Sequence, residues 1–178
     1  NDKPITSGVF WITHYHLNKQ IVKLGKSHIR LTDNGFTNYY TMFVAETAMI
    51  DAGTSLLEFT NTTPSIYSNN NATYHNLLFS NSSGTSTIET YYNAQFPGNN
   101  PKASRFNRIE IRNNGIMLGN NTIDSLIFTA GKTYDLDVLQ DQTINEYFQV
   151  IGNNCNPIEL RSTVSGNKAE VIMNGGKV

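Results

Sequence analysis

The sequence predicts an all-β protein, most simply a right-handed parallel β-helix in which short strands stack as the coils of a solenoid. One short apolar pattern recurs along the chain, and each copy is followed by an Asn- or Gly-rich turn and a second apolar strand. A strand–turn–strand unit this short cannot bury its apolar face alone, so it must lie on the next copy. Parallel β crossovers are right-handed in nearly all proteins, which predicts the handedness.

The recurring pattern is clearest in three segments. In each, a large apolar residue is followed three positions later by Leu or Ile, and two positions after that by Phe or Ile. The three copies are Tyr74, Leu77 and Phe79; Phe106, Ile109 and Ile111; and Ile123, Leu126 and Phe128. The last two members of each copy are two residues apart, so both side chains leave the same face of a strand.

The end of the pattern also recurs outside these segments. Leu57 and Phe59 repeat it, and Phe148 and Val150 repeat it with a shift of one residue, which suggests a β-bulge. First strands follow one another at roughly 20-residue intervals, within the range of solenoid repeats. Because the spacing is uneven, an antiparallel β-sandwich of short strands is the alternative.

Residues 1–50 are predicted to form N-terminal strands that are either the first coils or a cap. The strand candidates are residues 9–12, 20–24, 28–31 and 41–44. Gly25 and the run Asp33-Asn34-Gly35 are turn signals, and the latter lacks the further acidic ligands of a calcium loop. Residues 46–50 are the nearest approach to a helix and are too few to form one.

Residues 51–178 are predicted to be solenoid coils, in a single domain overall, with one insertion at about 89–104. Insertions in solenoids lie on one face, which is often the binding face. Tyr91 and Tyr92 open this insertion, and exposed tyrosines can stack on sugar rings or anchor a protein partner. They are therefore the candidate ligand contacts. The start at Asn1 and the glycine-rich end suggest a fragment of a longer solenoid.

The composition excludes several classes of partner. Only 15% of residues are charged and the net charge is −1, so no basic field for nucleic acid is predicted. No apolar run is long enough to span a bilayer. The polar residues are instead mainly Asn, Thr and Ser; asparagine suits tight turns and can stack in ladders between repeats.

Cys155 is the only cysteine, so no disulfide can form within the chain. The prediction is a buried structural thiol. The alternatives are pairing with a cysteine outside this chain, or metal binding.

No metal site or cofactor is predicted. His14 and His16 are two residues apart and would project from one face of a strand, but no third ligand stands at a recognisable spacing. Both are predicted to be exposed strand histidines. His28 and His75 are isolated and are predicted to be structural.

No catalytic residues are predicted. Carboxylates such as Glu110 and Asp124 could approach each other on adjacent coils, as β-helix polysaccharide lyases and hydrolases require. The favoured interpretation is that they are solvated residues between the inward-facing ones. The sequence has no nucleophile elbow, phosphate-binding glycine loop or dinucleotide fingerprint.

Four segments match the N-glycosylation sequon, as expected by chance in a chain rich in Asn, Ser and Thr; they begin at Asn61, Asn71, Asn81 and Asn120.

Three phrases within residues 52–59, 120–134 and 155–166 resemble the repeat regions of large secreted bacterial surface proteins. These are adhesin-like chains exported through a type IX secretion system. The resemblance covers roughly residues 50–178 and implies an extracellular location, further domains in the same long chain, and the secretion machinery as a partner. It carries over no catalytic residue. Asp124, Ser125 and Leu126 also resemble the short site at which such bacteria attach O-glycans.

The expected function is therefore a non-catalytic structural and adhesive segment of a bacterial cell-surface or secreted protein. Its loops would present a surface to a glycan or to a cell-surface protein. The alternative is a carbohydrate-active β-helix enzyme, such as a polysaccharide lyase or hydrolase. A third hypothesis is a passive passenger segment of a secretion substrate.

Overall fold

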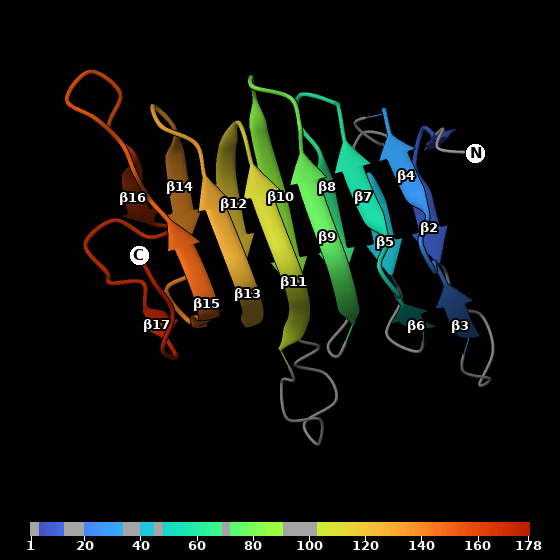
Figure 1. Cartoon of the computed structure of the whole chain (residues 1–178). Helices are drawn as coiled ribbons and strands as arrows, with labels where there is room; N and C mark the ends of the chain where they lie inside the picture. The colour runs from blue at the N-terminus through green and yellow to red at the C-terminus, as the bar shows by residue number, and fades with distance from the viewer. Residues whose placement is uncertain (1–3, 13–19, 34–39, 45–47, 69–71, 91–102) are drawn as a thin grey trace.

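The computed structural model describes residues 4–12, 20–33, 40–44, 48–68, 72–90 and 103–178, and throughout these ranges the chain forms strands and turns. The strands make two sheets that lie as two layers, with β2 and β4 at one end of the stack and β16 and β17 at the other (Figure 1). No helix long and apolar enough to cross a membrane occurs in the part of the chain that is described.

The larger sheet, sheet A, has ten described strands, and sheet B has seven. Sheet A contains β1 (Ile5–Ser7), β3 (Gln20–Lys23), β4 (His28–Leu31), β6 (Ala48–Asp51), β7 (Leu56–Phe59), β9 (Thr73–Phe79), β11 (Ser104–Ile111), β13 (Asn121–Phe128), β15 (Gln142–Gln149) and β17 (Val171–Met173). Sheet B contains β2 (Phe10–Ile12), β5 (Met42–Val44), β8 (Ser65–Ser68), β10 (Thr85–Thr90), β12 (Asn114–Leu118), β14 (Thr133–Leu136) and β16 (Glu159–Ser162).

All pairs between the described strands are parallel. From β7 onward the chain alternates between the sheets, so each strand pairs with the strand two elements away. We call one sheet A strand and the sheet B strand that follows it a coil. This stacking agrees with the predicted solenoid architecture. The alternative of an antiparallel sandwich is wrong for the described residues.

The first strands join the same two sheets. β1 and β4 continue sheet A, β2 and β5 continue sheet B, and β3 and β6 form a short extra ladder. β9 then pairs with β6 through its first residue, Thr73, and with β7 through its later residues. From β9 onward, one long strand of sheet A thus replaces two shorter ones.

The repeated apolar pattern becomes three columns of inward-facing side chains. The first column includes Tyr74, Phe106 and Ile123; the second Leu77, Ile109 and Leu126; and the third Phe79, Ile111 and Phe128. Each of these nine side chains is at most 2% exposed. Aromatic members stack along a column, with 4.7 Å between the rings of Phe59 and Phe79 and 5.1 Å between those of Tyr74 and Phe106. The pattern therefore predicted the core correctly.

The predicted bulge is also confirmed. Ile123 pairs with Ile144, but Ser125 pairs with Tyr147, so β15 contains one more residue than β13 over this stretch. An extra residue on one strand is the definition of a bulge. It restores Phe148 to the second inward column, opposite Leu126.

Buried asparagines connect neighbouring coils at the turns. Asn121 accepts a hydrogen bond from Thr90 Oγ1 at 2.6 Å and donates one to Gln142 Oε1 at 2.9 Å. Asn61, the first residue of one sequon, is only 7% exposed and donates to the carbonyl oxygen of Asp33. Its amide is therefore used inside the fold, in keeping with a chance sequon.

The prediction of a buried Cys155 is wrong. The thiol-bearing residue is exposed, as are all of residues 151–157. Asn153 Oδ1 accepts hydrogen bonds from the backbone N–H groups of Cys155 and Asn156, at 3.0 and 2.8 Å. These bonds close a tight turn that projects from the stack, so Cys155 cannot reach the core.

Candidate functional site

A hollow of about 450 Å³ crosses the outer face of sheet A, near the starts of its long strands. Two rows of outward-facing polar side chains line it, and we call it the polar trough. The first row is Asp51, Thr73, Arg105 and Thr122, and the second is His75, Asn107, Asp124 and Asn145. Together the rows cross five strands of sheet A, from β6 to β15.

The strand pattern explains both rows. Each row residue is the direct sequence neighbour of an inward-facing core residue; for example, Thr73 and His75 flank Tyr74. Alternate residues of a strand point to opposite faces, so these neighbours point outward. The parallel register then aligns equivalent positions, as in the pairing of Thr73 with Arg105 and of Arg105 with Thr122. The trough is thus the outer counterpart of the core column that contains Tyr74.

Hydrogen bonds along the second row orient its side chains. Asn145 Nδ2 donates to Asp124 Oδ1 at 2.8 Å, and Asn174 Nδ2 donates to Asn145 Oδ1 at 3.3 Å. Asn107 Nδ2 donates to the Oδ1 of Asn76 at 3.0 Å. His75 Nδ1 is buried and has no hydrogen-bond partner among the described residues. The row therefore combines oriented amide and carboxylate groups with one buried nitrogen that is unsatisfied.

The trough can bind polar ligands through hydrogen bonds. Carboxylate and amide oxygens accept them, while amide nitrogens and the Arg105 guanidinium donate them. No group of three or more His, Cys, Asp or Glu side chains able to hold a metal ion occurs in the described ranges. The arrangement suits a ligand rich in hydroxyl groups.

Glu110 and Asp124 do not form a catalytic pair. Glu110 pairs with Ile127, whereas Asp124 lies at the level of Asn107, three residues earlier on β11 and roughly 10 Å away along the strand. Partial burial tends to raise the pKa of Glu110, but hydrogen bonds from Arg108 at 2.9 Å and Arg112 at 2.7 Å lower it overall. Glu110 is therefore an ionised partner of two arginines, outside the trough.

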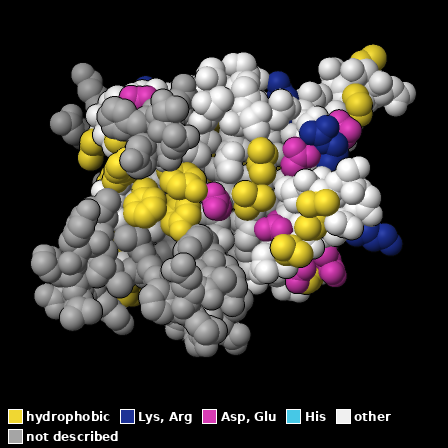
Figure 2. Space-filling view, turned by 180° about the vertical axis from the view of Figure 1, so that it is seen from behind, with side chains coloured by type: hydrophobic (Ala, Val, Ile, Leu, Met, Phe, Trp, Pro, Cys, Tyr) yellow, Lys and Arg dark blue, Asp and Glu magenta, His cyan; other side chains and the backbone are white. Residues whose placement is uncertain are grey.

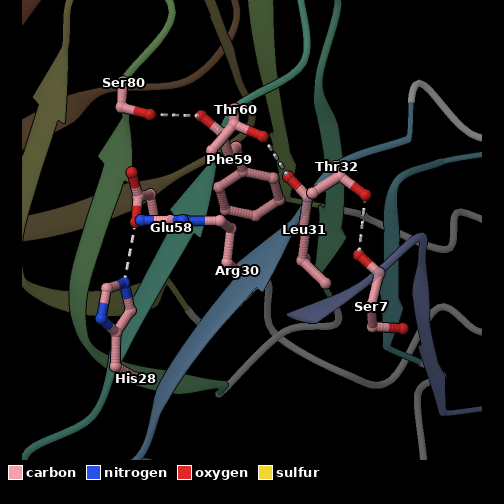
Figure 3. A network of polar contacts seen from close by, with 9 residues as sticks. All are labelled: Ser7, His28, Arg30, Leu31, Thr32, Glu58, Phe59, Thr60 and Ser80. Carbon is pink, nitrogen blue, oxygen red and sulfur yellow. Dashed lines mark hydrogen bonds and ion pairs between the residues drawn. The ribbon is translucent and has the colours of Figure 1, made fainter. Parts of the chain in front are cut away.

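A second carboxylate joins neighbouring coils of sheet A. Glu58 Oε2 lies 2.8 Å from His28 Nε2 and 3.1 Å from Arg30 Nε, and only 12% of the Glu58 side chain is exposed (Figure 3). Partial burial tends to raise the pKa of Glu58, but the hydrogen bonds from His28 and Arg30 outweigh it, so the pKa lies below the usual 4.5. His28 thus has the structural role that the sequence predicted.

Substitution of Glu58 by glutamine is expected to lower the free energy of unfolding by about 1–2 kcal/mol at neutral pH, because charged hydrogen bonds to partly exposed partners are lost. The pKa is lower in the folded state, so the unfolded state binds more protons on acidification. The contribution of Glu58 is therefore present above about pH 4.5 and disappears as the pH falls through the folded-state pKa.

Urea denaturation of both proteins at neutral pH and at about pH 3 measures this contribution. The difference in stability should shrink on acidification. The exposed Glu146 provides the control, and its replacement by glutamine should change little at either pH. An unchanged difference between wild type and Glu58→Gln at acidic pH would contradict the assignment.

The outer face of sheet B has an aromatic cluster at its N-terminal end. Trp11, Phe43 and Tyr67 occupy paired positions on β2, β5 and β8, with ring centroids 6.5 and 5.0 Å apart. Tyr40 packs against Tyr67 at 4.8 Å and donates a hydrogen bond to Glu89 Oε2 at 2.8 Å. Burial, with the Glu89 carboxylate, raises the pKa of Tyr40 to about 12. Hydrophobic side chains gather visibly on this side of the molecule (Figure 2).

This cluster mainly packs on itself. The rings of Phe43 and Tyr67 are stacked, with 16° between their planes, so each covers a face of the other. Trp11 is the most exposed member, at 37%. Such aromatic pairs add to the stability that burial alone gives. The cluster therefore stabilises the first coils and is a weaker candidate for a ligand site than the trough.

Only some of the residues that the sequence singled out lie within the described ranges. Tyr91, Tyr92, His14 and His16 lie outside the described residues. Ser125, in the sequence that resembles an O-glycan attachment site, lies half-buried within β13, where it pairs with Arg108 and Tyr147.

The sequence did not predict the trough as a site. His75 was expected to be structural, and Asp124 was considered only as a partner of Glu110. The available signal was that polar residues flank the first apolar residue of every pattern copy, as Arg105 and Asn107 flank Phe106.

No protein-family model matches the chain, and neither the curated proteins nor the solved structures include a significant match. The resemblance to bacterial surface proteins therefore remains a prediction. The geometry of the two sheets and of the polar trough is the basis for a proposed function.

Proposed function

We propose that the chain is a non-catalytic structural and adhesive segment of a secreted or cell-surface bacterial protein, and that it binds a glycan. In this proposal the two parallel sheets close into a right-handed parallel β-helix within a longer chain exported by a type IX secretion system. Further domains of that chain, the secretion machinery and protein ligands at the cell surface are its partners, and its location is extracellular.

The polar trough is the observation that carries the proposal. The side chains of its two rows are carboxylates, amides, hydroxyls, one guanidinium and one imidazole, which together offer both donors and acceptors. The rest of the lining comes from Ile50, Ala52, Gly53, Tyr74 and Phe106. A volume of about 450 Å³ falls within the range of ligand sites. Sugars present many hydroxyl groups that both donate and accept, so they match this lining better than an apolar ligand does.

The parallel stacking supports a structural role. Each described coil is joined to its neighbours by a ladder of backbone hydrogen bonds, and the turns between strands can vary without breaking it. Stacked repeats of this kind make extended, stiff molecules with long binding surfaces. The net charge of −1 gives no support to a nucleic-acid partner.

A carbohydrate-active β-helix enzyme is the second candidate. The observation that favours it is the presence of Asp124, His75 and Arg105 in one hollow. Carboxylate and imidazole groups are the usual general acids and bases in enzymes.

Screening the chain on a glycan array, together with an assay for new reducing ends on the glycans that bind, separates the candidates. Binding without turnover is expected. Turnover that is lost on Asp124→Asn would instead establish the enzyme, and neither binding nor turnover would favour a passive passenger segment. The double variant Tyr91→Ala/Tyr92→Ala tests whether the predicted loop contacts add to binding.

A further inference from the structure

We propose that the polar trough binds an unbranched, uncharged polysaccharide that lies along the axis of the stack and contacts one coil after another. This inference rests on the proposed glycan-binding function, and it adds the location, the orientation and the chemical class of the ligand.

The two rows of the trough set the orientation. The strands β9, β11 and β13 each contribute one outward residue to each row, while β6 and β15 each contribute to one row only. Neighbouring strands are about 4.8 Å apart. This spacing is close to the length that one sugar ring adds to an extended glycan chain. A glycan laid along the trough would therefore meet a new pair of side chains with each ring, for example Thr73 with His75 and then Arg105 with Asn107.

Backbone pairing makes a peptide a poor ligand. A peptide that adds a strand to a sheet needs a free strand edge. β9, β11, β13 and β15 each pair on both sides, so the floor of the trough has no such edge. The ligand must be recognised by side chains alone, and those of the two rows are polar.

The charges of the trough favour a neutral ligand. Asp51 and Asp124 bring two negative charges and Arg105 brings one positive charge. The remaining row residues are hydroxyl, amide and imidazole groups. A polyanion such as a polyuronate would meet more repulsion than attraction, whereas neutral hydroxyl groups can pair with every member.

The unsatisfied nitrogen of His75 lies beside the trough. Buried polar atoms nearly always have a hydrogen-bond partner, and His75 Nδ1 has none among the described residues. His75 lines the trough, and because Nδ1 is shielded from solvent, a sugar hydroxyl could provide the missing partner only after the imidazole ring turns toward the trough.

Calorimetry with cello-oligosaccharides and chito-oligosaccharides, from the monomer to the hexamer, tests the inference, with oligogalacturonates as the charged comparison. Affinity should rise stepwise with chain length as far as the tetramer, and the neutral series should bind more tightly than the oligogalacturonates. Asp124→Asn and Arg105→Gln should each weaken binding of the hexamer by about tenfold, the usual effect of one charged hydrogen bond.

Sheet B offers a matched control. Asp135 and Arg161 also pair on an outer face, at 2.9 Å, and they line a separate hollow outside the trough, so they also test that hollow as the competing site. Asp135→Asn and Arg161→Gln should leave the affinity unchanged. Circular dichroism of all four variants shows whether each has kept its fold.

The outcomes separate this inference from the proposed function. If glycans bind equally well as monomers and hexamers, or if the trough variants bind like wild type, the trough proposal is wrong while glycan binding stands. Tighter binding of oligogalacturonates would overturn the assignment of a neutral ligand. If no linear glycan binds in calorimetry or on the array, both proposals fail.

Discussion

Replacement of Phe79 by alanine is expected to lower the free energy of unfolding by about 3–5 kcal/mol, the usual cost of removing a buried phenylalanine ring. The Phe79 side chain is fully buried. It stacks on Phe59 of the preceding coil, with ring centroids 4.7 Å apart and 15° between the planes, and it pairs with Ile111 of the next coil. The backbones on both sides are held by the sheet, so the cavity cannot collapse easily.

Urea denaturation of wild type, Phe79→Ala and Phe79→Leu measures this effect. The leucine variant keeps most of the buried volume and should cost less than about 1.5 kcal/mol. If the alanine and leucine variants lost the same amount of stability, the core column that contains Phe79 would not be tightly packed at this position. A loss below about 1 kcal/mol for the alanine variant would contradict full burial of the ring.

Substitution of Gly84 by alanine is expected to lower the free energy of unfolding by about 3 kcal/mol. This is the sum of two effects, an unfavourable backbone conformation and a steric clash of the new Cβ atom. Gly84 has a φ of +81°, a conformation that L-residues rarely adopt. A Cβ atom there would lie 1.9 Å from the carbonyl oxygen of Thr62, which belongs to the preceding coil. That oxygen also accepts a hydrogen bond from the backbone N–H of Thr85 at 3.0 Å, so it cannot move away without losing this bond.

Gly166 provides a matched control, because alanine there would have the unfavourable backbone conformation without the steric clash. Its φ is +84°, but a Cβ atom there would meet nothing within 4 Å. Gly166→Ala should therefore cost only about 1–2 kcal/mol, from the backbone conformation alone. Thermal or urea denaturation compares the two variants. Equal losses would mean that the turn at Gly84 moves freely relative to the coil before it.

The sequence predicted the core more fully than any other part of the molecule. Tyr74, Leu77 and Phe79 are spaced three and two residues apart, and this spacing recurs because equivalent residues must superpose in a parallel stack. The pattern therefore revealed both the inward columns and the bulge near Phe148. Cys155 was mispredicted because burial depends on where a turn projects, and a turn sequence does not show this.

The candidate site could be predicted only in part. Asp124 and His75 are conspicuous residue types, but nothing in the sequence alone shows that they belong to one row, because they are far apart in the chain. Their alignment depends on the register of β9, β11 and β13. The pairing of Glu58 with His28 and Arg30 depends in the same way on the register of β4 and β7. The contacts between coils could therefore be identified only from the structure.

The pairing of each described sheet A strand with its neighbours also bears on how such a molecule can evolve. Duplication of a whole coil would place the new strands against partners that resemble their present ones. Deletion of a single residue within a strand would instead turn every later side chain of that strand to the opposite face. Genetic change can therefore alter the span of the molecule in steps of about 4.8 Å while its cross-section stays the same.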